Sequence, residues 1–284
     1  MVSRCEQTLK EKRYYEAMLQ YKALFARYSG KDSWIQGVMV LRTAAMTMNW
    51  HQRCQEGLEF GLMIIEFFRT VMPKTLELEF YHDCFVISES FDKRNSQARA
   101  AQLEFLTAAL NFSREANPKS AGNPQINRLL AIHYKDAGNV ALAHSHFAMG
   151  DNHEKFVDAL MTWSASAPAH EKQLFVARAV LQSICAERLK LAEDVLVHCQ
   201  DKGMLTPPYR DGPMMNFCNL LIKSCEKKER ALFEMLQKEY AMTIRTDPLF
   251  EEYMHKIGEI HFVEEPPVSG MQRLLRSLFG TSQS

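Results

Sequence analysis

The spacing of apolar residues constrains the fold of this chain more than any other feature. Within residues 14–28, apolar side chains recur every three or four positions, which places them along one face of an α-helix. The same period returns at residues 174–185, 189–199 and 250–260. A brief alternation with a period of two at residues 76–80 is equally compatible with a helix. The pattern predicts an all-α fold.

Glycine, proline and asparagine residues divide this periodic sequence into short helices. Turn or cap signals fall at Ser29-Gly30, Pro73, Asn117-Pro118, Gly122-Asn123-Pro124, Gly138-Asn139, Gly150-Asp151, Pro168, Asp247-Pro248 and Pro266-Pro267. The intervening runs give about fourteen helices, or roughly six to seven antiparallel pairs joined by short connections. Helix pairs in series are typical of an α-solenoid, in which each pair buries its apolar stripe against its neighbours.

One segment carries the signature of a tetratricopeptide unit. Tyr134, Gly138, Ala143 and Phe147 follow its order of tyrosine, glycine, small and aromatic residues, in which the small residue lets two helices approach closely. No fixed period of about 34 residues holds along the chain. We therefore expect an irregular, tetratricopeptide-like α-solenoid, with N-terminal helical repeats at residues 1–150 and C-terminal helical repeats at residues 151–284.

The motifs that mark common enzymes are missing from the sequence. It contains no GxxxxGK[ST], GxGxxG, GxSxG or HExxH pattern. The closest approach to a metal-ligand cluster is His144, His146, Asp151 and His153, but the first two lie about 200° apart around a helix. We expect no catalytic residue, no metal site and no cofactor, and predict that the protein is not an enzyme. The alternative within the enzyme class is a hydrolase with an unrecognised site.

Composition limits the partners and the compartment. The chain has 34 basic and 34 acidic residues and a pI near 7.1, which argues against nucleic-acid binding. No stretch approaches the ~18 uncharged apolar residues of a membrane span, so we expect no stable membrane insertion. Seven scattered cysteines without a CxxC motif, and a charged N-terminal segment, indicate a reduced chain in the cytosol.

Three local features suggest contacts with other proteins. Residues 1–31 carry seven basic and three acidic residues, whereas residues 249–265 carry one basic and five acidic residues. Residues 203–213 contain five glycines and prolines, which fits either an insertion that serves a partner or a plain connector. A short basic amphipathic helix is predicted at residues 270–280, where it would dock on the solenoid or on a partner.

Four segments, at residues 12–28, 122–147, 175–185 and 239–262, resemble the Golgi to ER traffic protein 4 family. The ending, with Pro266-Pro267 before a leucine-rich helix, is also similar to that family. The resemblance covers nearly the whole chain in order and spacing, and is weaker at residues 30–56 and 86–118. It implies a non-catalytic α-solenoid adaptor in the post-translational delivery of tail-anchored membrane proteins to the endoplasmic reticulum.

The resemblance also implies partners for each half of the chain. In the family, the N-terminal half binds an ArsA-like targeting ATPase. The C-terminal half binds a ubiquitin-like-domain protein and, in animals, a BAG-type scaffold protein. The positions that match the ATPase side are Tyr14, Tyr15, Arg27 and Glu59, the last of which is an aspartate in the family. The positions expected for the ubiquitin-like partner are Pro208, Tyr209, Phe217, Leu220 and Leu221.

Alternatives stay open for these residues and for the whole chain. Four residues fall on apolar helix stripes and fit the core as well as an interface: Tyr14, Tyr28, Phe217 and Leu221. Arg27 and Glu59 are polar, so an interface and a solvated face are both compatible with them. The alternative function is a helical-repeat scaffold subunit of another multiprotein assembly, similar to a proteasome lid.

Overall fold

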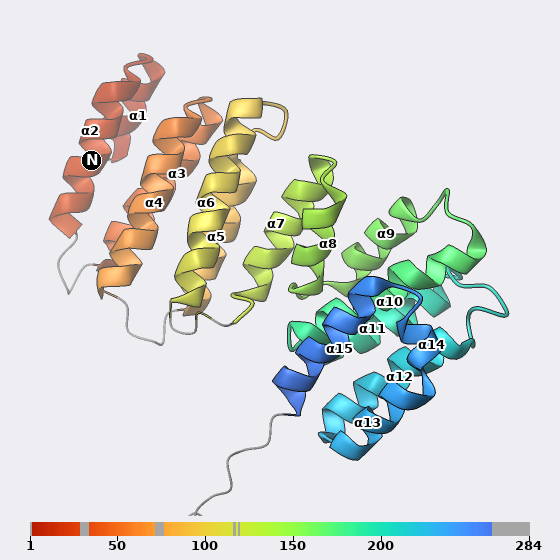
Figure 1. The fold of residues 1–284 in the computed structure, drawn as a ribbon. Coiled ribbons are helices and arrows are strands. Elements are labelled where there is room, and N and C mark those ends of the chain that lie inside the picture. Colours follow the sequence, from red (N-terminus) through yellow and green to blue (C-terminus); the bar gives the residue numbers. More distant parts are fainter. Residues whose placement is uncertain (1, 29–33, 72–76, 116–117, 119, 263–284) are drawn as a thin grey trace, which may run out of the picture. The chain divides into compact units, whose positions relative to one another are not determined.

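The structure, a computed structural model, describes residues 2–28, 34–71, 77–115, 118 and 120–262. Its regular secondary structure within these ranges is entirely α-helical and comprises fifteen helices (Figure 1). The predicted all-α solenoid is confirmed. The chain divides into two compact units, Met1–Ala159 and Leu160–Ser284. The amphipathic helix predicted at residues 270–280 lies outside the described residues.

Unit 1 contains the first eight helices and most of the ninth. They are α1 (Val2–Lys10), α2 (Tyr14–Tyr28), α3 (Trp34–Trp50), α4 (Cys54–Val71), α5 (Glu77–Ser90), α6 (Ser96–Arg114), α7 (Pro124–Asp136), α8 (Val140–Ala148) and α9 (His153–Trp163). Unit 2 contains α10 (Ala169–Cys185), α11 (Leu189–Asp201), α12 (Pro213–Lys227), α13 (Arg230–Glu239), α14 (Ala241–Ile244) and α15 (Pro248–His261). None of these helices is long and apolar enough to span a membrane.

The helices of unit 1 form two layers. In one layer α3 contacts α5 and α5 contacts α7, and in the other α4 contacts α6 (Figure 1). Side chains of α2 meet those of α4, with ring centroids 6.1 Å apart for Tyr21 and Phe60 and 5.4 Å apart for Phe25 and Phe67. Tyr21, Phe60 and Phe105 are fully buried. The core of unit 1 therefore lies between the layers.

Helices α3 and α4 approach each other closely at Gly57. A Cβ atom at this position would lie 1.9 Å from Oδ1 of Asn49 and 3.1 Å from the carbonyl oxygen of Ala45. Asn49 is buried, and its Nδ2 donates a hydrogen bond to Oγ of Ser90 at 2.8 Å. Because the amide group cannot turn aside without losing that bond, only glycine fits this helix crossing.

Several of the predicted breaks between helices are helix caps. The side chains of Asn123 and Asp247 accept hydrogen bonds from backbone N–H groups at the starts of α7 and α15. Gly138 has a φ of 75°, a left-handed conformation that favours glycine between α7 and α8. Ala143 and Phe147 are buried on α8, which packs on α7. The tetratricopeptide-like pattern thus corresponds to a real helix pair.

The centre of unit 2 is α10, which contacts α11, α12 and α15. Polar contacts between side chains join α10 to α15 and its cap. Nε of Arg178 donates to Oδ2 of the buried Asp247, and Nε2 of Gln182 donates to the hydroxyl oxygen of Tyr253. Removing Arg178 would leave a buried carboxylate without its cation, which is costly. These contacts fix the last described helix on the core of unit 2.

The close approach at Gly57 leads to a stability prediction. Gly57→Ala is expected to lower the free energy of unfolding by about 1–3 kcal/mol, because the added methyl group overpacks the α3–α4 crossing. Urea denaturation of the full chain, followed by circular dichroism, measures this change.

Gly258→Ala on α15 is the matched control, since a Cβ atom there meets nothing closer than Cε1 of Phe233 at 3.5 Å. The control should be neutral or up to about 1 kcal/mol more stable, because alanine favours the helix. A Gly57→Ala variant as stable as Gly258→Ala would contradict the close crossing.

Candidate interaction surfaces

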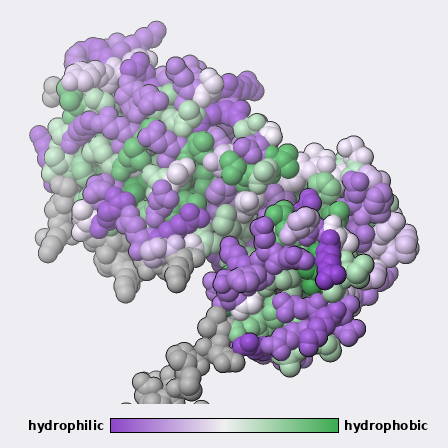
Figure 2. Space-filling view, in the orientation of Figure 1, coloured by the Kyte–Doolittle hydropathy of each residue, from purple (hydrophilic) through white to green (hydrophobic). Residues whose placement is uncertain are grey.

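The first candidate surface lies on the exposed face of α2. This helix buries one stripe toward the core, made of Ala17, Tyr21 and Leu24. The opposite face presents Tyr15, which is 69% exposed, and Leu19, which is 46% exposed. Lys22 continues the same stripe seven positions after Tyr15. In the orientation of Figure 1, hydrophobic side chains reach the surface of unit 1 in small patches among hydrophilic ones (Figure 2).

Acidic residues of α4 extend this surface. Glu59 is exposed and forms an ion pair with Lys22 of α2. Seven positions later on the same face, Glu66 pairs with Arg69, which also pairs with Glu115, the C-cap residue of α6. The hydrogen bonds that Arg69 donates to the carboxylates of Glu115 and Glu66 raise the pKa of Arg69. The surface therefore carries both signs of charge across three helices of one layer.

The remaining residues predicted for the ATPase side lie at the two ends of α2. Tyr14 is half-buried, with its ring 5.6 Å from that of His51 and 5.4 Å from the guanidinium of Arg53. Arg27 is exposed in the last turn, about 18 Å along the helix from Tyr15 at 1.5 Å per residue. The structure thus brings Tyr15 and the Lys22–Glu59 pair onto one surface and packs Tyr14 against the α3–α4 turn.

Sequence reasoning missed Leu19 and Lys22, although the signal was present. They lie four and seven positions after Tyr15 and so share its helix face. The buried stripe of α2 was recognised from its period, and the opposite face follows from the same period. Reading that outer face would have identified both residues as exposed neighbours of Tyr15.

The second candidate surface is the connection between α11 and α12 in unit 2. Met204 and Leu205 are buried and anchor it, whereas Pro208 is exposed. The backbone N–H of Tyr209 donates to the carbonyl oxygen of Thr206 at 2.9 Å. The connection consists of turns, without strands in residues 203–212, and its prolines exclude a helix interior. It is a folded loop that presents Pro208 to solvent.

The residues of α12 predicted for the ubiquitin-like partner divide into two groups. Phe217 and Leu221 are 0% exposed, so a partner cannot reach them in this structure. They lie in the core of unit 2. Their apolar stripe was compatible with either a core or an interface position, and the structure shows the core position. Leu220 is half-buried, as is Tyr209 in the loop, and Pro208 is exposed. Only these last three can form a contact surface.

Among the histidines between residues 144 and 153, His146 of α8 packs against α7. Nδ1 of His146 lies 2.9 Å from Oδ1 of Asn127, and its ring stacks on Tyr134 with centroids 5.4 Å apart. Burial, with the nearby Arg114, lowers the pKa of His146 to about 4, so its imidazole is neutral at pH 7. Within the described residues, no group of three or more His, Cys, Asp or Glu side chains is arranged to hold a metal ion.

The cysteines are buried rather than activated. Six of the seven are buried, and Cys185 is half-buried. Burial raises the pKa of Cys185 to about 11, and that of Cys199 and Cys218 to about 12. A thiol with a raised pKa stays protonated at neutral pH and is a weak nucleophile. These three thiols lack the lowered pKa of catalytic cysteines.

Stacked helix pairs with exposed stripes on their outer faces define an α-solenoid protein, a class that commonly binds other proteins along its helices. The model of the Golgi to ER traffic protein 4 family matches residues 34–279 of this chain. This chain belongs to the Golgi to ER traffic protein 4 family.

Relatives from distant organisms match over nearly the whole chain. The Golgi to ER traffic protein 4 homolog of Dictyostelium discoideum is 24% identical over 285 residues, covering 99% of this chain and 89% of the relative. The homolog of Homo sapiens is 24% identical over 281 residues, covering 95% of this chain and 83% of the relative. The crystal structure of C. therm. Get4 has a TM-score of 0.72 at 20% identity, with 99% and 95% of the two chains covered. The last comparison shows that the fold is shared.

The burial of His146 leads to a prediction on pH dependence. Its pKa is about 4 in the folded chain and 6.5 for an unperturbed histidine, so between these values the unfolded chain binds the proton more readily. The contribution of neutral His146 to stability is therefore complete at pH 7 and is lost as the pH falls toward 4. His146→Gln should reduce the difference in unfolding free energy between pH 7 and pH 5, measured by urea denaturation.

His255→Gln is the control, because the His255 side chain is 77% exposed on α15. It should preserve the pH dependence of the parent chain. The assignment to His146 is wrong if His146→Gln shows the same pH dependence as the parent.

Proposed function

We propose that this chain is a non-catalytic adaptor in the post-translational delivery of tail-anchored membrane proteins to the endoplasmic reticulum. In this proposal it acts in the cytosol and bridges an ArsA-like targeting ATPase and a ubiquitin-like-domain co-chaperone. The observation that supports it most is that the two candidate surfaces lie on separate compact units. Two partners could then bind without competing for the same helices. The names of the similar proteins refer to Golgi to ER traffic, which supports a role in protein transport involving the endoplasmic reticulum.

The α2–α4 surface has the character of a transient interface. Tyr15 and Leu19 supply exposed aromatic and aliphatic area, the kind of contact that anchors interfaces. Lys22 and Glu59 supply charges that steer association. Because both charged side chains are a third or more exposed, their pair is worth about 1 kcal/mol or less. Glu59 can therefore exchange Lys22 for a basic group of the ATPase at little cost.

The loop of unit 2 supports the second partner in a different way. Its turns and its buried anchors, Met204 and Leu205, hold Pro208 and Tyr209 in a defined position before binding. A preformed loop loses less conformational entropy when a partner binds, which favours affinity. We propose that Pro208, Tyr209 and Leu220 contact the ubiquitin-like protein, while Phe217 and Leu221 support them from the core.

Unit 2 is also the proposed site for a BAG-type scaffold protein where one is present.

The alternative function, a scaffold subunit of an assembly similar to a proteasome lid, predicts stable complexes that contain no targeting ATPase. The raised thiol pKa values support a non-catalytic role and disfavour a cysteine hydrolase.

The role of Glu59 can be tested by charge reversal. Glu59→Lys should weaken ATPase binding by about threefold or more at low salt, and the difference should shrink at high salt, because exposed charges are screened. Biolayer interferometry with the purified ATPase at about 0.05 M and 0.5 M salt measures both effects.

Glu193→Lys on α11 is closely matched, since Glu193 is also 48% exposed and also pairs with a lysine, Lys190. It makes the same change in net charge in unit 2 and should bind the ATPase like the parent chain. An equal loss in both variants would remove Glu59 from the proposed interface and leave only a net-charge effect.

The loop of unit 2 gives a separate prediction. Tyr209→Ala should weaken binding of the ubiquitin-like-domain protein by about tenfold, because aromatic anchors carry much of the energy of an interface. Binding of the ATPase to unit 1 should not change. Met242→Ala, at a side chain 76% exposed on α14, is the control and should leave both affinities unchanged. Isothermal titration calorimetry that finds Tyr209→Ala equal to Met242→Ala would argue against the loop as a contact.

A further inference from the structure

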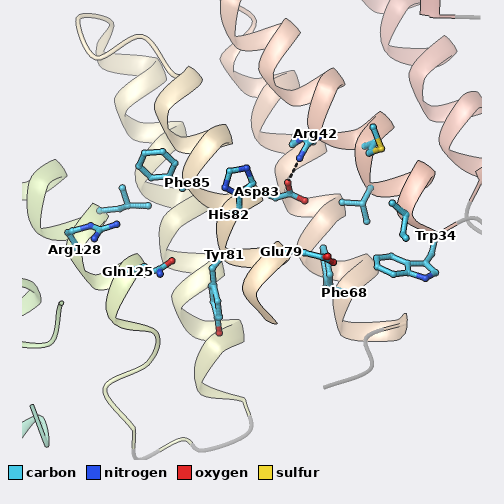
Figure 3. A pocket seen from close by; sticks show the side chains of 14 residues that line it. Trp34, Arg42, Phe68, Glu79, Tyr81, His82, Asp83, Phe85, Gln125 and Arg128 are labelled. Atoms are coloured by element: carbon cyan, nitrogen blue, oxygen red, sulfur yellow. Dashed lines mark hydrogen bonds and ion pairs between the residues drawn. The ribbon is translucent and has the colours of Figure 1, made fainter. Parts of the chain in front are cut away.

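A groove crosses the other layer of unit 1, along α3, α5 and α7, and has a volume of about 600 Å³ (Figure 3). Its floor is formed by buried side chains that include Val38, Phe68 and Leu129. Three large apolar side chains stand exposed among its lining residues: Ile35 at 53% and Met39 at 50% on α3, and Phe85 at 43% on α5. None of these residues belongs to the surfaces proposed above.

The arrangement of these apolar residues is that of a binding surface. Ile35 and Met39 are four positions apart and so share one face of α3, while Phe85 faces the same hollow from α5. Single exposed apolar residues are ordinary, but several that border one hollow across two helices mark an interaction site. Met39 adds a flexible, polarizable side chain that adapts to different apolar partners.

The two arginines that line the groove are each paired with a carboxylate, and the exposed His82 lies between Glu79 and Asp83 in the sequence of α5. Arg42 pairs with the buried Asp83 at 2.8 Å, and Arg128 pairs with Asp151 at 3.0 Å. Glu79 is exposed, and among the described residues no cation is paired with it. In Figure 3, Glu79 lies toward Trp34, and Arg128 lies on the far side of the groove. Within the part of the chain that the structure describes, a partner thus meets an apolar hollow with an exposed carboxylate that forms no ion pair, Glu79, at the Trp34 end.

We propose that this groove binds a short amphipathic α-helix of a partner protein. The helix would present three apolar side chains at positions i, i+4 and i+7, and a lysine or arginine at the end that meets Glu79. The hollow is within the roughly 300–1,000 Å³ range of ligand sites. Its walls are helices, so apolar side chains can pack in as they do when a helix enters a groove. A helix N-terminus directed at Glu79 would add a favourable dipole interaction.

Two fluorescein-labelled helical peptides test this proposal against the full chain. They share three leucines on one face and differ only near the N-terminus, where one has lysine and the other glutamate. The lysine peptide should bind at micromolar concentration, and the glutamate peptide about threefold or more weakly, as for other exposed charge pairs. Glu79→Lys should reverse this preference in fluorescence anisotropy. A reversed preference between the two peptides would show that the basic residue of the bound peptide lies next to Glu79.

Variants of the exposed apolar residues that line the groove test independently whether the peptide binds there. Phe85→Glu should weaken binding of the lysine peptide by at least about tenfold, because it removes an apolar anchor and adds a charge. Leu142→Glu on α8 is the matched control, with a side chain 41% exposed and the same change in charge, and should bind like the parent chain. Circular dichroism checks that both variants fold. Phe85→Glu should retain ATPase binding, which separates this groove from the α2–α4 surface.

Three results would overturn the proposal. The first is that neither peptide binds the parent chain at concentrations up to the millimolar range. The second is that Phe85→Glu and Leu142→Glu weaken binding equally, which would indicate non-specific association. The third is that light scattering detects a dimer of the parent chain that Phe85→Glu abolishes, which would make the occupant of the groove a second copy of this chain.

Discussion

Burial of one apolar stripe per helix, between two layers of helices, is the constraint on which this structure depends. Helices this short are marginally stable in isolation, so each must be held by its neighbours. The layers achieve this by close crossing, with Gly57 against Ala45 and Asn49, and with fully buried aromatic rings such as Tyr21 and Phe60. The inner faces of the helices are required for this packing. Residues on the outer faces can therefore change without loss of the fold.

The two layers of unit 1 therefore offer two chemically different outer faces. The α2–α4 face carries Tyr15 and Leu19 beside paired charges such as Lys22 and Glu59, a combination suited to fast and reversible association. The face of α3, α5 and α7 carries an apolar groove whose internal charges are mostly paired, a combination suited to apolar anchors. An adaptor can use such a difference to bind dissimilar partners on one unit.

Local sequence signals were sufficient for the fold but not for the surfaces. Helical period, and caps such as Asn123 and Asp247, depend on residues close in sequence, so the helices and many of their boundaries could be predicted. Whether an apolar stripe of a helix is exposed depends on how many sides of that helix are covered by neighbouring helices. Helix α12 packs against α10, α11 and α13, so Phe217 and Leu221 are buried although they follow an exposed loop.

The groove could not be predicted because it joins residues distant in sequence. Its lining extends from Trp34 to Leu129, and no local pattern relates Met39 on α3 to Phe85 on α5. The exposed stripe of α2 is the opposite case, since Leu19 follows from the same period that identified the buried stripe. Contacts within one helix can be inferred from the sequence, and contacts across a layer need the structure.

The proposal that this chain is a two-partner adaptor is tested most directly by adding both partners together. Native mass spectrometry of the full chain with the targeting ATPase and the ubiquitin-like-domain protein should detect one complex that contains all three proteins. Titration of either partner should give the same affinity, within about twofold, whether or not the other is bound, because separate sites have no coupling free energy. Displacement of one partner by the other would contradict the account.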